Sequence, residues 1–287
     1  MRSTSRWDSN AVRDYYNANT RRFLQWGKDR GTFNIHGALW PPGVVRLDKA
    51  LEYANELVRK TAAGMTPPAT SLLDLGCGVG SGLFYLSRYL KSFQKGYGIS
   101  ISPVQIEIAL RRAKSAKDTR LHFAVIDFLE AGQFFKQIDL AYSIEAFAHA
   151  SDPGRFFQQA ASALRPGGKL VLIDDTQVGM NLNPKEERLL QTYRHHWLLP
   201  SLLPENSVLG LAEANGLVLE SHLDLTPWLR LRRPRDRFVS VAAFLFRSLL
   251  ARSWYGKSLL GGDAKQKCYL KGITQYRLWV FAKTSDA

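Results

Sequence analysis

The chain has 287 residues, of which 45% are hydrophobic, and it carries a formal net charge of +14. This length and apolar content predict one large domain, or one domain with a cap. They exclude a membrane-spanning helix, because the most apolar stretch, residues 238–251, is broken by Arg247. The first residues have no apolar core for a signal peptide. Two cysteines give no disulfide framework, so we expect a cytoplasmic protein.

In chain order, the first predicted element is an aromatic and basic helix over residues 10–27. It precedes the predicted sheet, as a lid would. We therefore expect residues 1–66 to form a helical lid and substrate region, and residues 67–287 to form a second, larger domain. Proline pairs before residue 43 and at 67–68 mark breaks in the chain.

The most informative segment is residues 72–82, LLDLGCGVGSG. A short buried strand containing Asp74 is followed by three alternating glycines, Gly76, Gly78 and Gly80, and a helix is predicted over 81–90. A strand, a glycine turn and a helix N-terminus form a site for a nucleotide-sized ligand. The glycines let the backbone turn sharply and approach a ligand closely. The dinucleotide fingerprint G-x-G-x-x-G does not fit, because Ser81 stands where its third glycine belongs.

Strands and helices alternate as far as residue 174. Strands are predicted at 96–102, 121–126, 138–144 and 170–174, and helices at 104–115 and 152–164. Ser102 is the expected N-cap of the helix after the second strand, with Pro103 at its first position. Short loops between alternating elements predict a parallel sheet with right-handed crossovers. Residues 217–225 and 273–283 are predicted to close that sheet.

The segment Asp-Leu-Gly-Cys-Gly-Val-Gly resembles motif I of the S-adenosylmethionine-dependent methyltransferases, and the resemblance covers about residues 70–175. It implies an α/β fold with the Rossmann-like seven-stranded sheet of the class I enzymes, and S-adenosylmethionine as cofactor. Two segments are longer than this sheet needs, about 180–204 and 227–272. We expect them to be cap insertions that shape a substrate pocket.

The resemblance also implies cofactor-binding residues. Asp74 would approach the methionine ammonium, and the three glycines would contribute backbone atoms. Most methyltransferases hold the ribose with an acid at the end of the second strand, where this chain has Ile99-Ser100. The sequence instead is similar to the Gly-Ile/Val-x-x-Ser-x-x-Gln variant of sterol and tocopherol C-methyltransferases and cyclopropane fatty-acid synthases. That variant implies ribose binding by Ser100 and Gln105.

Further cofactor contacts are expected after the third strand and at the end of the fourth. Asp127 can accept a hydrogen bond from the adenine amino group. Phe128 can offer a backbone amide or stack on the base, although a core aromatic is an equally good interpretation. Ser143 is a further candidate for contact with the cofactor.

The chemistry is expected in residues 143–152, because ligands of open α/β sheets bind outside the carboxyl ends of the strands. The pattern Ser-Ile-Glu-Ala-x-x-His-Ala is similar to sterol C24-methyltransferases. Methylation of an alkene leaves a carbocation, which Glu145 can stabilise and deprotonate, while His149 can relay or accept the proton. Simpler interpretations are that Glu145 only binds loop amides and that His149 is structural.

The flanking segments supply further candidates. Tyr15 and Tyr16 resemble tyrosines that close over the methyl donor, and we expect them in the catalytic region. The substrate head group is assigned to Arg230, Arg232, Arg233, His195 and His196. Arginine suits bidentate phosphate binding, although these arginines can also pair with Asp236 and solvent. Neighbouring histidines point to different sides of a helix, so no metal site is expected.

These features predict an S-adenosylmethionine-dependent C-methyltransferase that acts on an alkene carbon of a small hydrophobic substrate, with an isoprenoid or prenyl diphosphate as the leading candidate. Two alternatives stay open: O- or N-methylation of a natural product with His149 as the base, and a cyclase on the same fold. No RNA-binding motif is apparent, so no nucleic acid is expected. Membrane contact is expected to be peripheral at most, and a homo-oligomer is compatible with the sequence.

Overall fold

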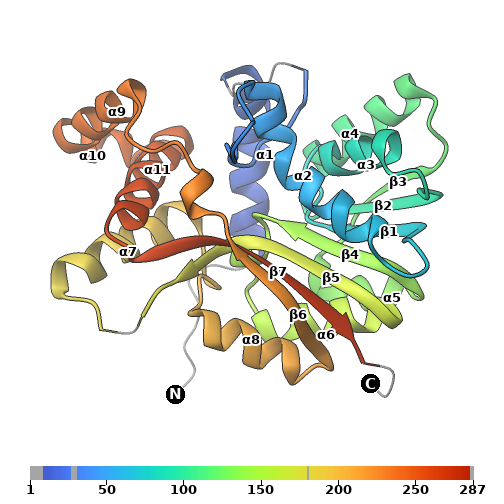
Figure 1. The fold of residues 1–287 in the computed structure, drawn as a ribbon. Coiled ribbons are helices and arrows are strands. Elements are labelled where there is room, and N and C mark those ends of the chain that lie inside the picture. The colour runs from blue at the N-terminus through green and yellow to red at the C-terminus, as the bar shows by residue number, and fades with distance from the viewer. Residues whose placement is uncertain (1–8, 27–30, 180, 285–287) are drawn as a thin grey trace.

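A seven-stranded sheet forms the centre of the computed structural model, which describes residues 9–26, 31–179 and 181–284 (Figure 1). The strands are β1 (Ser71–Leu75), β2 (Lys95–Ser100), β3 (Leu121–Val125), β4 (Ile138–Ile144), β5 (Leu164–Gln177), β6 (Leu217–Asp224) and β7 (Thr274–Lys283). Their order is β3-β2-β1-β4-β5-β7-β6. The first five pair in parallel, whereas β7 is antiparallel to both β5 and β6. The predicted seven-stranded Rossmann-like sheet is therefore confirmed.

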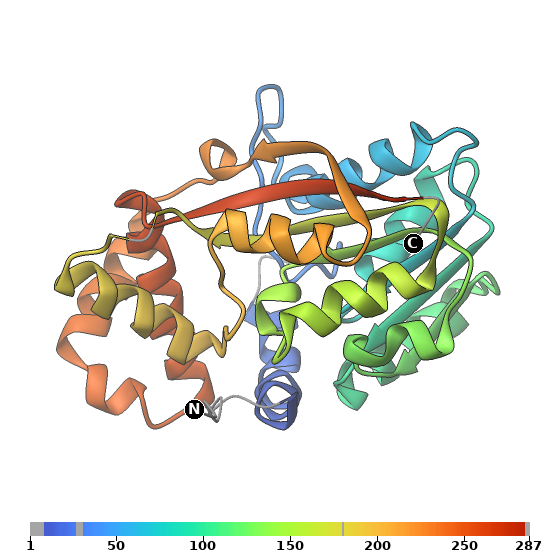
Figure 2. The same ribbon diagram turned by 90° about the horizontal axis from the view of Figure 1, so that it is seen from below.

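Helices cover both faces of this sheet. The helices are α1 (Ser9–Trp26), α2 (Leu47–Ala63), α3 (Ser81–Tyr89), α4 (Pro103–Ala116), α5 (Ala131–Phe134), α6 (Pro153–Ala163), α7 (Pro184–Trp197), α8 (Glu205–Glu213), α9 (Pro234–Leu245), α10 (Arg247–Leu250) and α11 (Trp254–Leu270). Residues of α2, α3 and α4 share one buried cluster with Leu72 of β1. Residues of α6 and α8 share a second cluster with the next residue, Leu73 (Figure 2). Alternate residues of a strand face opposite sides, so both faces of β1 are buried.

The two predicted insertions pack together as one helical cap. Residues 180–204 contain α7, and residues 227–272 contain α9, α10 and α11. Leu190 and Tyr193 of α7 share a buried cluster with Ala264 and Cys268 of α11. These helices lie together at one end of the sheet, beyond the end of β5 (Figures 1 and 2). The proposed boundary at residue 66 stays a prediction, and residues 1–8 and 27–30 of the predicted lid lie outside the described residues.

Most predicted elements differ from the structure by one or two residues, and β5 differs more. The predicted strand 170–174 is in fact part of Leu164–Gln177. The extension at its end follows from pairing with β7, whose residues match β5 from Lys169 to Gln177. The predicted cap at Ser102 is confirmed, since its side chain accepts a hydrogen bond from the Gln105 amide. No helix of the described residues is long and apolar enough to cross a membrane.

Candidate active site

A cavity of about 750 Å³ lies at the carboxyl ends of the parallel strands. Residues from the ends of β1, β2, β4 and β5 line it, together with side chains from α1 and from the cap. The strand order reverses between β1 and β4, which is where open α/β sheets bind ligands. Its volume is in the range of sites for cofactors and small molecules.

Most of the site residues predicted from the sequence meet at this cavity. Those that line it are Tyr15, Tyr16, Asp74, Gly76, Gly78, Ser100, Gln105, Asp127, Phe128, Glu145, His149, Arg230 and Arg233. The cavity therefore joins residues that are more than two hundred positions apart in the sequence.

The structure places five predicted residues away from the cavity lining: Gly80, Ser143, Arg232, His195 and His196. A Cβ on Gly80 would lie 2.7 Å from the Phe123 ring. Ser143 is fully buried in β4, between two residues whose side chains point to the opposite face. Burial and the neighbouring His195 lower the pKa of His196 to about 4, so this imidazole is neutral and ill suited to an anionic head group.

The glycine turn brings backbone close to the cavity. Gly76 has φ +107°, and a Cβ there would lie 2.4 Å from the Ala146 Cβ. Gly78 has φ +53°, but a Cβ there would meet only the Ile35 side chain, at 3.5 Å. The Gly76 and Cys77 amides donate to the Ile99 carbonyl, at 3.1 and 2.9 Å. Both glycines line the cavity, but only at Gly76 does a neighbouring side chain leave no room for a Cβ.

Polar atoms meet in front of the turn, around Gly82. A Cβ on Gly82 would lie 3.2 Å from Asn55 Oδ1 and 3.2 Å from Asp74 Oδ2. The Asn55 amide nitrogen donates to Asn34 Oδ1 at 3.1 Å, and Asn55 Oδ1 is buried without a hydrogen-bond partner. Burial raises the pKa of Asp74 to about 7. An unpartnered carbonyl oxygen beside a carboxylate suits a ligand with several N–H donors, such as an ammonium.

The end of β2 carries an uncharged polar pair. The Ser100 hydroxyl donates to Gln105 Oε1 at 2.8 Å, and both side chains are buried in the cavity wall. Asp127 already accepts two hydrogen bonds, from the Ser9 hydroxyl at 2.8 Å and the Leu129 amide at 2.9 Å. The start of α1 thus lies against the region expected to hold adenine. Phe128 lines the cavity and also packs on Phe156, with ring centroids 5.3 Å apart.

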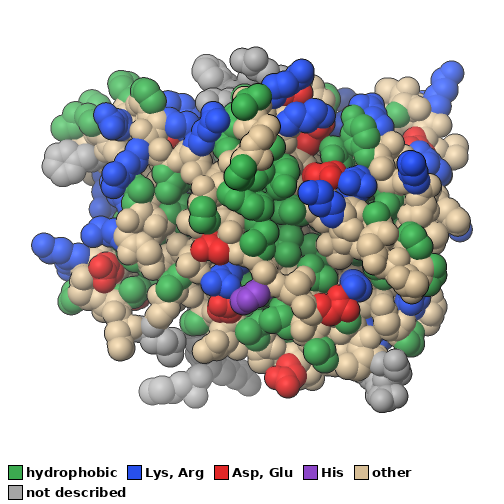
Figure 3. Space-filling view, in the orientation of Figure 1, with side chains coloured by type: hydrophobic (Ala, Val, Ile, Leu, Met, Phe, Trp, Pro, Cys, Tyr) green, Lys and Arg blue, Asp and Glu red, His purple; other side chains and the backbone are tan. Residues whose placement is uncertain are grey.

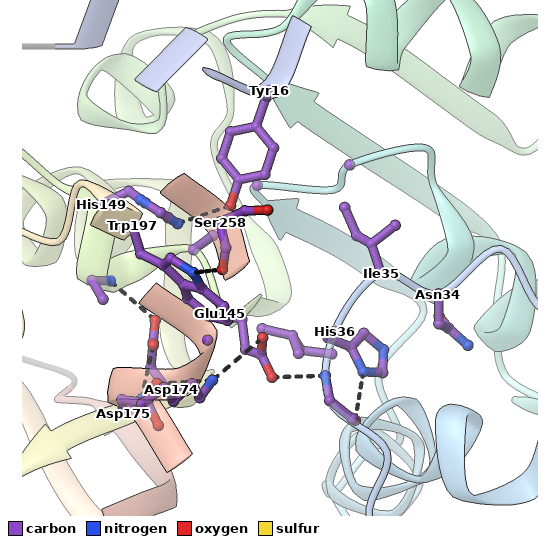
Figure 4. Close-up of a pocket in the computed structure, with 18 of the residues that line it drawn as sticks. Tyr16, Asn34, Ile35, His36, Glu145, His149, Asp174, Asp175, Trp197 and Ser258 are labelled. Carbon is purple, nitrogen blue, oxygen red and sulfur yellow. Dashed lines mark hydrogen bonds and ion pairs between the residues drawn. The ribbon is translucent and has the colours of Figure 1, made fainter. Parts of the chain in front are cut away.

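Tyr16 of α1 and His149 form a pair within the cavity (Figure 4). His149 Nδ1 lies 3.0 Å from the Leu198 carbonyl oxygen, which can only accept, so Nδ1 carries the hydrogen. Nε2 then accepts from the Tyr16 hydroxyl at 2.8 Å. Burial lowers the pKa of His149 to about 4. The imidazole is therefore neutral at physiological pH, with its basic nitrogen directed at Tyr16.

Glu145 lies directly after β4 in a left-handed backbone conformation, with φ +50°. Such a conformation is unfavourable for a glutamate, so surrounding contacts must hold it. Its amide donates to the Ile173 carbonyl at 2.9 Å, and its Oε1 accepts from the Gly37 amide at 2.8 Å (Figure 4). Burial alone would raise the pKa of Glu145, but Lys265, His36 and the Gly37 amide lower it below its usual value. Glu145 is therefore a partly buried, ionised carboxylate.

Lys265 of α11 supplies the opposing charge. Its Nζ lies 3.9 Å from Glu145 Oε2 and 3.0 Å from Asp175 Oδ2. Burial opposes its charge, yet Asp175 and Glu145 raise its pKa above the usual range. The ammonium lies over the rings of Trp197, Tyr269 and Tyr276, at 4.9, 5.7 and 5.6 Å from their centroids. Aromatic faces favour a cation at such distances.

Two aspartates at the end of β5 complete this charged end of the cavity. Asp175 accepts from the Tyr193 and Tyr269 hydroxyls. Asp174 accepts from the Ala148 amide at 3.0 Å, and burial together with Asp175 raises its pKa to about 7. Our sequence reasoning missed Asn55, Lys265 and both aspartates. The Asp-Asp pair after an apolar strand was a usable signal, whereas Asn55 and Lys265 lie in helices with no motif.

The arginines of the cavity lining have protein contacts. The Arg230 guanidinium lies 3.4 Å from the centroid of the Trp40 ring. Asp236 binds Arg233 at 2.9 Å and Arg235 at 3.4 Å. Two arginines share one carboxylate there, so this group of three side chains keeps a net positive charge. Among the described residues, no group of three or more His, Cys, Asp or Glu is arranged to hold a metal ion.

Comparison with known proteins identifies a domain within the chain. A family profile described as "Methyltransferase domain" matches residues 67–200. Residues 67–200 are a methyltransferase domain. A similar curated protein is the 2-methyl-6-phytyl-1,4-hydroquinone methyltransferase of Synechocystis sp., 26% identical over 77% of this chain and 66% of that protein. The probable tocopherol O-methyltransferase of Oryza sativa subsp. japonica is 36% identical over 42% of this chain and 32% of that protein.

Solved structures share the fold of this chain over nearly its whole length. The [4+2]-cyclase SpnF is 19% identical, with a TM-score of 0.74, over 96% of this chain and 97% of its own. Geranyl diphosphate C-methyltransferase from Streptomyces coelicolor A3(2) was solved in complex with S-adenosyl-L-homocysteine. It is 18% identical, with a TM-score of 0.70, over 96% of this chain and 97% of its own. The predicted class I methyltransferase domain is therefore confirmed, and S-adenosylmethionine is its expected cofactor. The chain spans one third to two thirds of the length of the two curated relatives named above.

The cavity of the methyltransferase domain fits this cofactor. The unpartnered Asn55 Oδ1 beside Asp74 suits the methionine ammonium. The space next to Gly78 admits a ligand where a larger side chain would stand, and the Ser100–Gln105 pair offers hydroxyl and amide groups to a ribose. When bound, S-adenosylmethionine would supply an electrophilic methyl group. The individual contacts stay predictions, and two tests of them follow.

We expect Gln105→Ala to weaken binding of S-adenosylhomocysteine by about 1–2 kcal/mol, the cost of losing a buried hydrogen bond. The same change removes the acceptor of the Ser100 hydroxyl. Calorimetry on the variant gives the affinity, and Gln133→Ala, an exposed change on α5, is the matched control. Equal affinity in Gln105→Ala and the parent would place the ribose elsewhere.

We expect the affinity for S-adenosylhomocysteine to rise as pH increases toward about 7 and to level off above it. The pKa of Asp74 is raised to about 7, so the carboxyl is protonated below that pH and must ionise to bind an ammonium. Calorimetry across this range should show proton release at low pH. Asp74→Asn should remove the dependence, and the exposed Asp14→Asn should keep it. A flat profile in the parent would contradict the contact.

Proposed function

We propose that the chain transfers a methyl group from S-adenosylmethionine to an alkene carbon of a small hydrophobic molecule. Glu145 carries the proposal, because it is a partly buried, ionised carboxylate in the cavity. Addition of a methyl cation equivalent to an alkene leaves a positive charge on the neighbouring carbon. Glu145 stabilises that charge, and the departing proton then moves to its carboxylate, or to Nε2 of His149.

The walls of the cavity support a hydrophobic substrate. Side chains of Trp40, Trp197, Leu231, Phe238 and Leu259 line it together with the charged groups. Aromatic faces also stabilise a carbocation. Arg230, Arg233 and Arg235 lie in the same lining. We infer an amphiphile whose hydrocarbon part reaches Glu145 and whose anionic head meets the arginines, as an isoprenoid or prenyl diphosphate would.

A second candidate reaction is O- or N-methylation, and the Tyr16–His149 pair favours it. The neutral His149 has its basic Nε2 in the cavity, where it can take a proton from a hydroxyl or amine once Tyr16 moves aside. The two reactions predict different bases, Glu145 for the alkene and His149 for the heteroatom. A cyclase on the same fold is a third possibility, which differs by leaving the mass of the substrate unchanged.

Incubation with methyl-labelled S-adenosylmethionine tests the proposal. The panel contains geranyl, farnesyl and isopentenyl diphosphates, a phytylated hydroquinone, sterols and simple phenols, each with and without the donor. Label on a carbon of an isoprenoid supports the proposal, and label on oxygen or nitrogen supports the second reaction. A donor-independent product of unchanged mass would instead identify a cyclase. Turnover of phenols alone would contradict the isoprenoid substrate.

A further inference from the structure

The surface of α9 and α10 exposes an unusual set of large apolar side chains. Five of them lie within residues 238–249 and are 55–75% exposed: Phe238, Val241, Leu245, Phe246 and Leu249. Spacings of three and four place the first three on one face of α9. The opposite side of the helix holds the buried Asp236 and Ala243. We call these five side chains the apolar face.

Basic side chains surround the apolar face. Residues 232–257 contain seven Lys or Arg and a single acid, Asp236, which is buried against Arg233. Arg235, Arg237, Arg247 and Arg252 are exposed. Figure 3 shows hydrophobic side chains gathered over α9 and α10, with Lys and Arg beside them. Apolar residues rimmed by cations are typical of helical segments that lie in the surface of a bilayer.

We propose that the apolar face docks on an anionic lipid bilayer, with Phe246 and Leu249 entering the acyl boundary and the arginines contacting lipid phosphates. The binding is peripheral, since no helix of the described residues can span the membrane. Charge distinguishes a bilayer from a second copy of the chain. A two-fold dimer would bring this basic surface against its own image, which like charges oppose, whereas anionic phosphates neutralise it.

The apolar face also borders the cavity. Phe238 belongs to both, and Val239, Arg233 and Arg235 next to it line the cavity. A bilayer on this surface would therefore lie at the cavity mouth, so that a membrane-dissolved hydrocarbon could enter without crossing water. This consequence rests on the proposed function, but the docking does not, because vesicle binding is measured without substrate or turnover.

Co-sedimentation with vesicles tests the docking directly. The full chain should bind vesicles of phosphatidylcholine and phosphatidylglycerol, bind pure phosphatidylcholine at least about tenfold more weakly, and dissociate as salt increases. Leu245→Ser and Leu249→Ser should each weaken binding by about tenfold, the effect of removing one buried leucine. Arg247→Gln should weaken it by about fivefold. Val218→Ser, a change at an apolar side chain on β6 that is 51% exposed, should have no effect.

Sedimentation velocity in the absence of lipid tests whether a second copy of the chain, instead of a bilayer, binds the apolar face. A monomer that binds anionic vesicles, with both leucine variants impaired and circular dichroism unchanged, supports the proposal. No binding to either vesicle, or binding that Leu245→Ser and Leu249→Ser leave intact, would overturn it. A dimer that the same two variants dissociate would also overturn it, because the apolar face would then belong to a second copy.

Discussion

Glu145→Gln should lower turnover by about two to four orders of magnitude, the range for a lost general base, while affinity for the methyl donor stays nearly unchanged. Glutamine preserves the size of the side chain, and its Oε1 can still accept from the Gly37 amide. It lacks the negative charge that would stabilise a carbocation and the basicity that would remove the proton. Lys265 keeps Asp175, at 3.0 Å, as its other partner. Single-turnover rates with saturating donor measure the effect.

Two further variants test whether the loss of turnover is specific to Glu145. Glu130→Gln, an exposed change outside the cavity, should behave as the parent. His149→Ala should reduce turnover less than Glu145→Gln if the histidine only relays a proton, and more if the substrate loses its proton from oxygen or nitrogen. An active Glu145→Gln together with an inactive His149→Ala would reject alkene methylation and leave the second reaction.

The central sheet could be predicted because its signals are local. Leu72 and Leu73 are both buried, on opposite faces of β1, so consecutive apolar residues make the strand easy to recognise. Ser102 caps α4 through its own side chain, which is again a contact within a few residues. The glycines of the turn need positive φ values, which an alternating Gly pattern predicts.

The charged end of the cavity could not be predicted in the same way. Glu145 was found because it follows a strand, but its ionised state depends on Lys265, one hundred and twenty residues further on in α11. The tautomer of His149 depends on a carbonyl at the end of α7. Ser143, a candidate for contact with the cofactor, is fully buried in β4 and does not line the cavity. These properties arise from tertiary packing, which no single-sequence pattern encodes.

Gly78→Val should weaken binding of S-adenosylmethionine and S-adenosylhomocysteine by at least about a hundredfold, or ~3 kcal/mol. A side chain there meets only Ile35 at 3.5 Å, so it can be accommodated by the protein but occupies space that the ligand needs. The left-handed backbone at Gly78 adds a stability cost of about 1–2 kcal/mol. Calorimetry and urea unfolding separate the two effects.

Gly76→Ala provides the contrast within the same turn. Its Cβ would overlap the Ala146 Cβ at 2.4 Å on a backbone with φ +107°, so the chain itself must shift. We expect a loss of about 3 kcal/mol in the free energy of unfolding, from backbone strain and overpacking together. Gly78→Val should therefore mainly reduce the affinity for the ligand, whereas Gly76→Ala should mainly reduce the free energy of unfolding. Near-parent ligand affinity in Gly78→Val would mean that the donor does not approach this turn, and the assignment of the glycine loop as its site would be wrong.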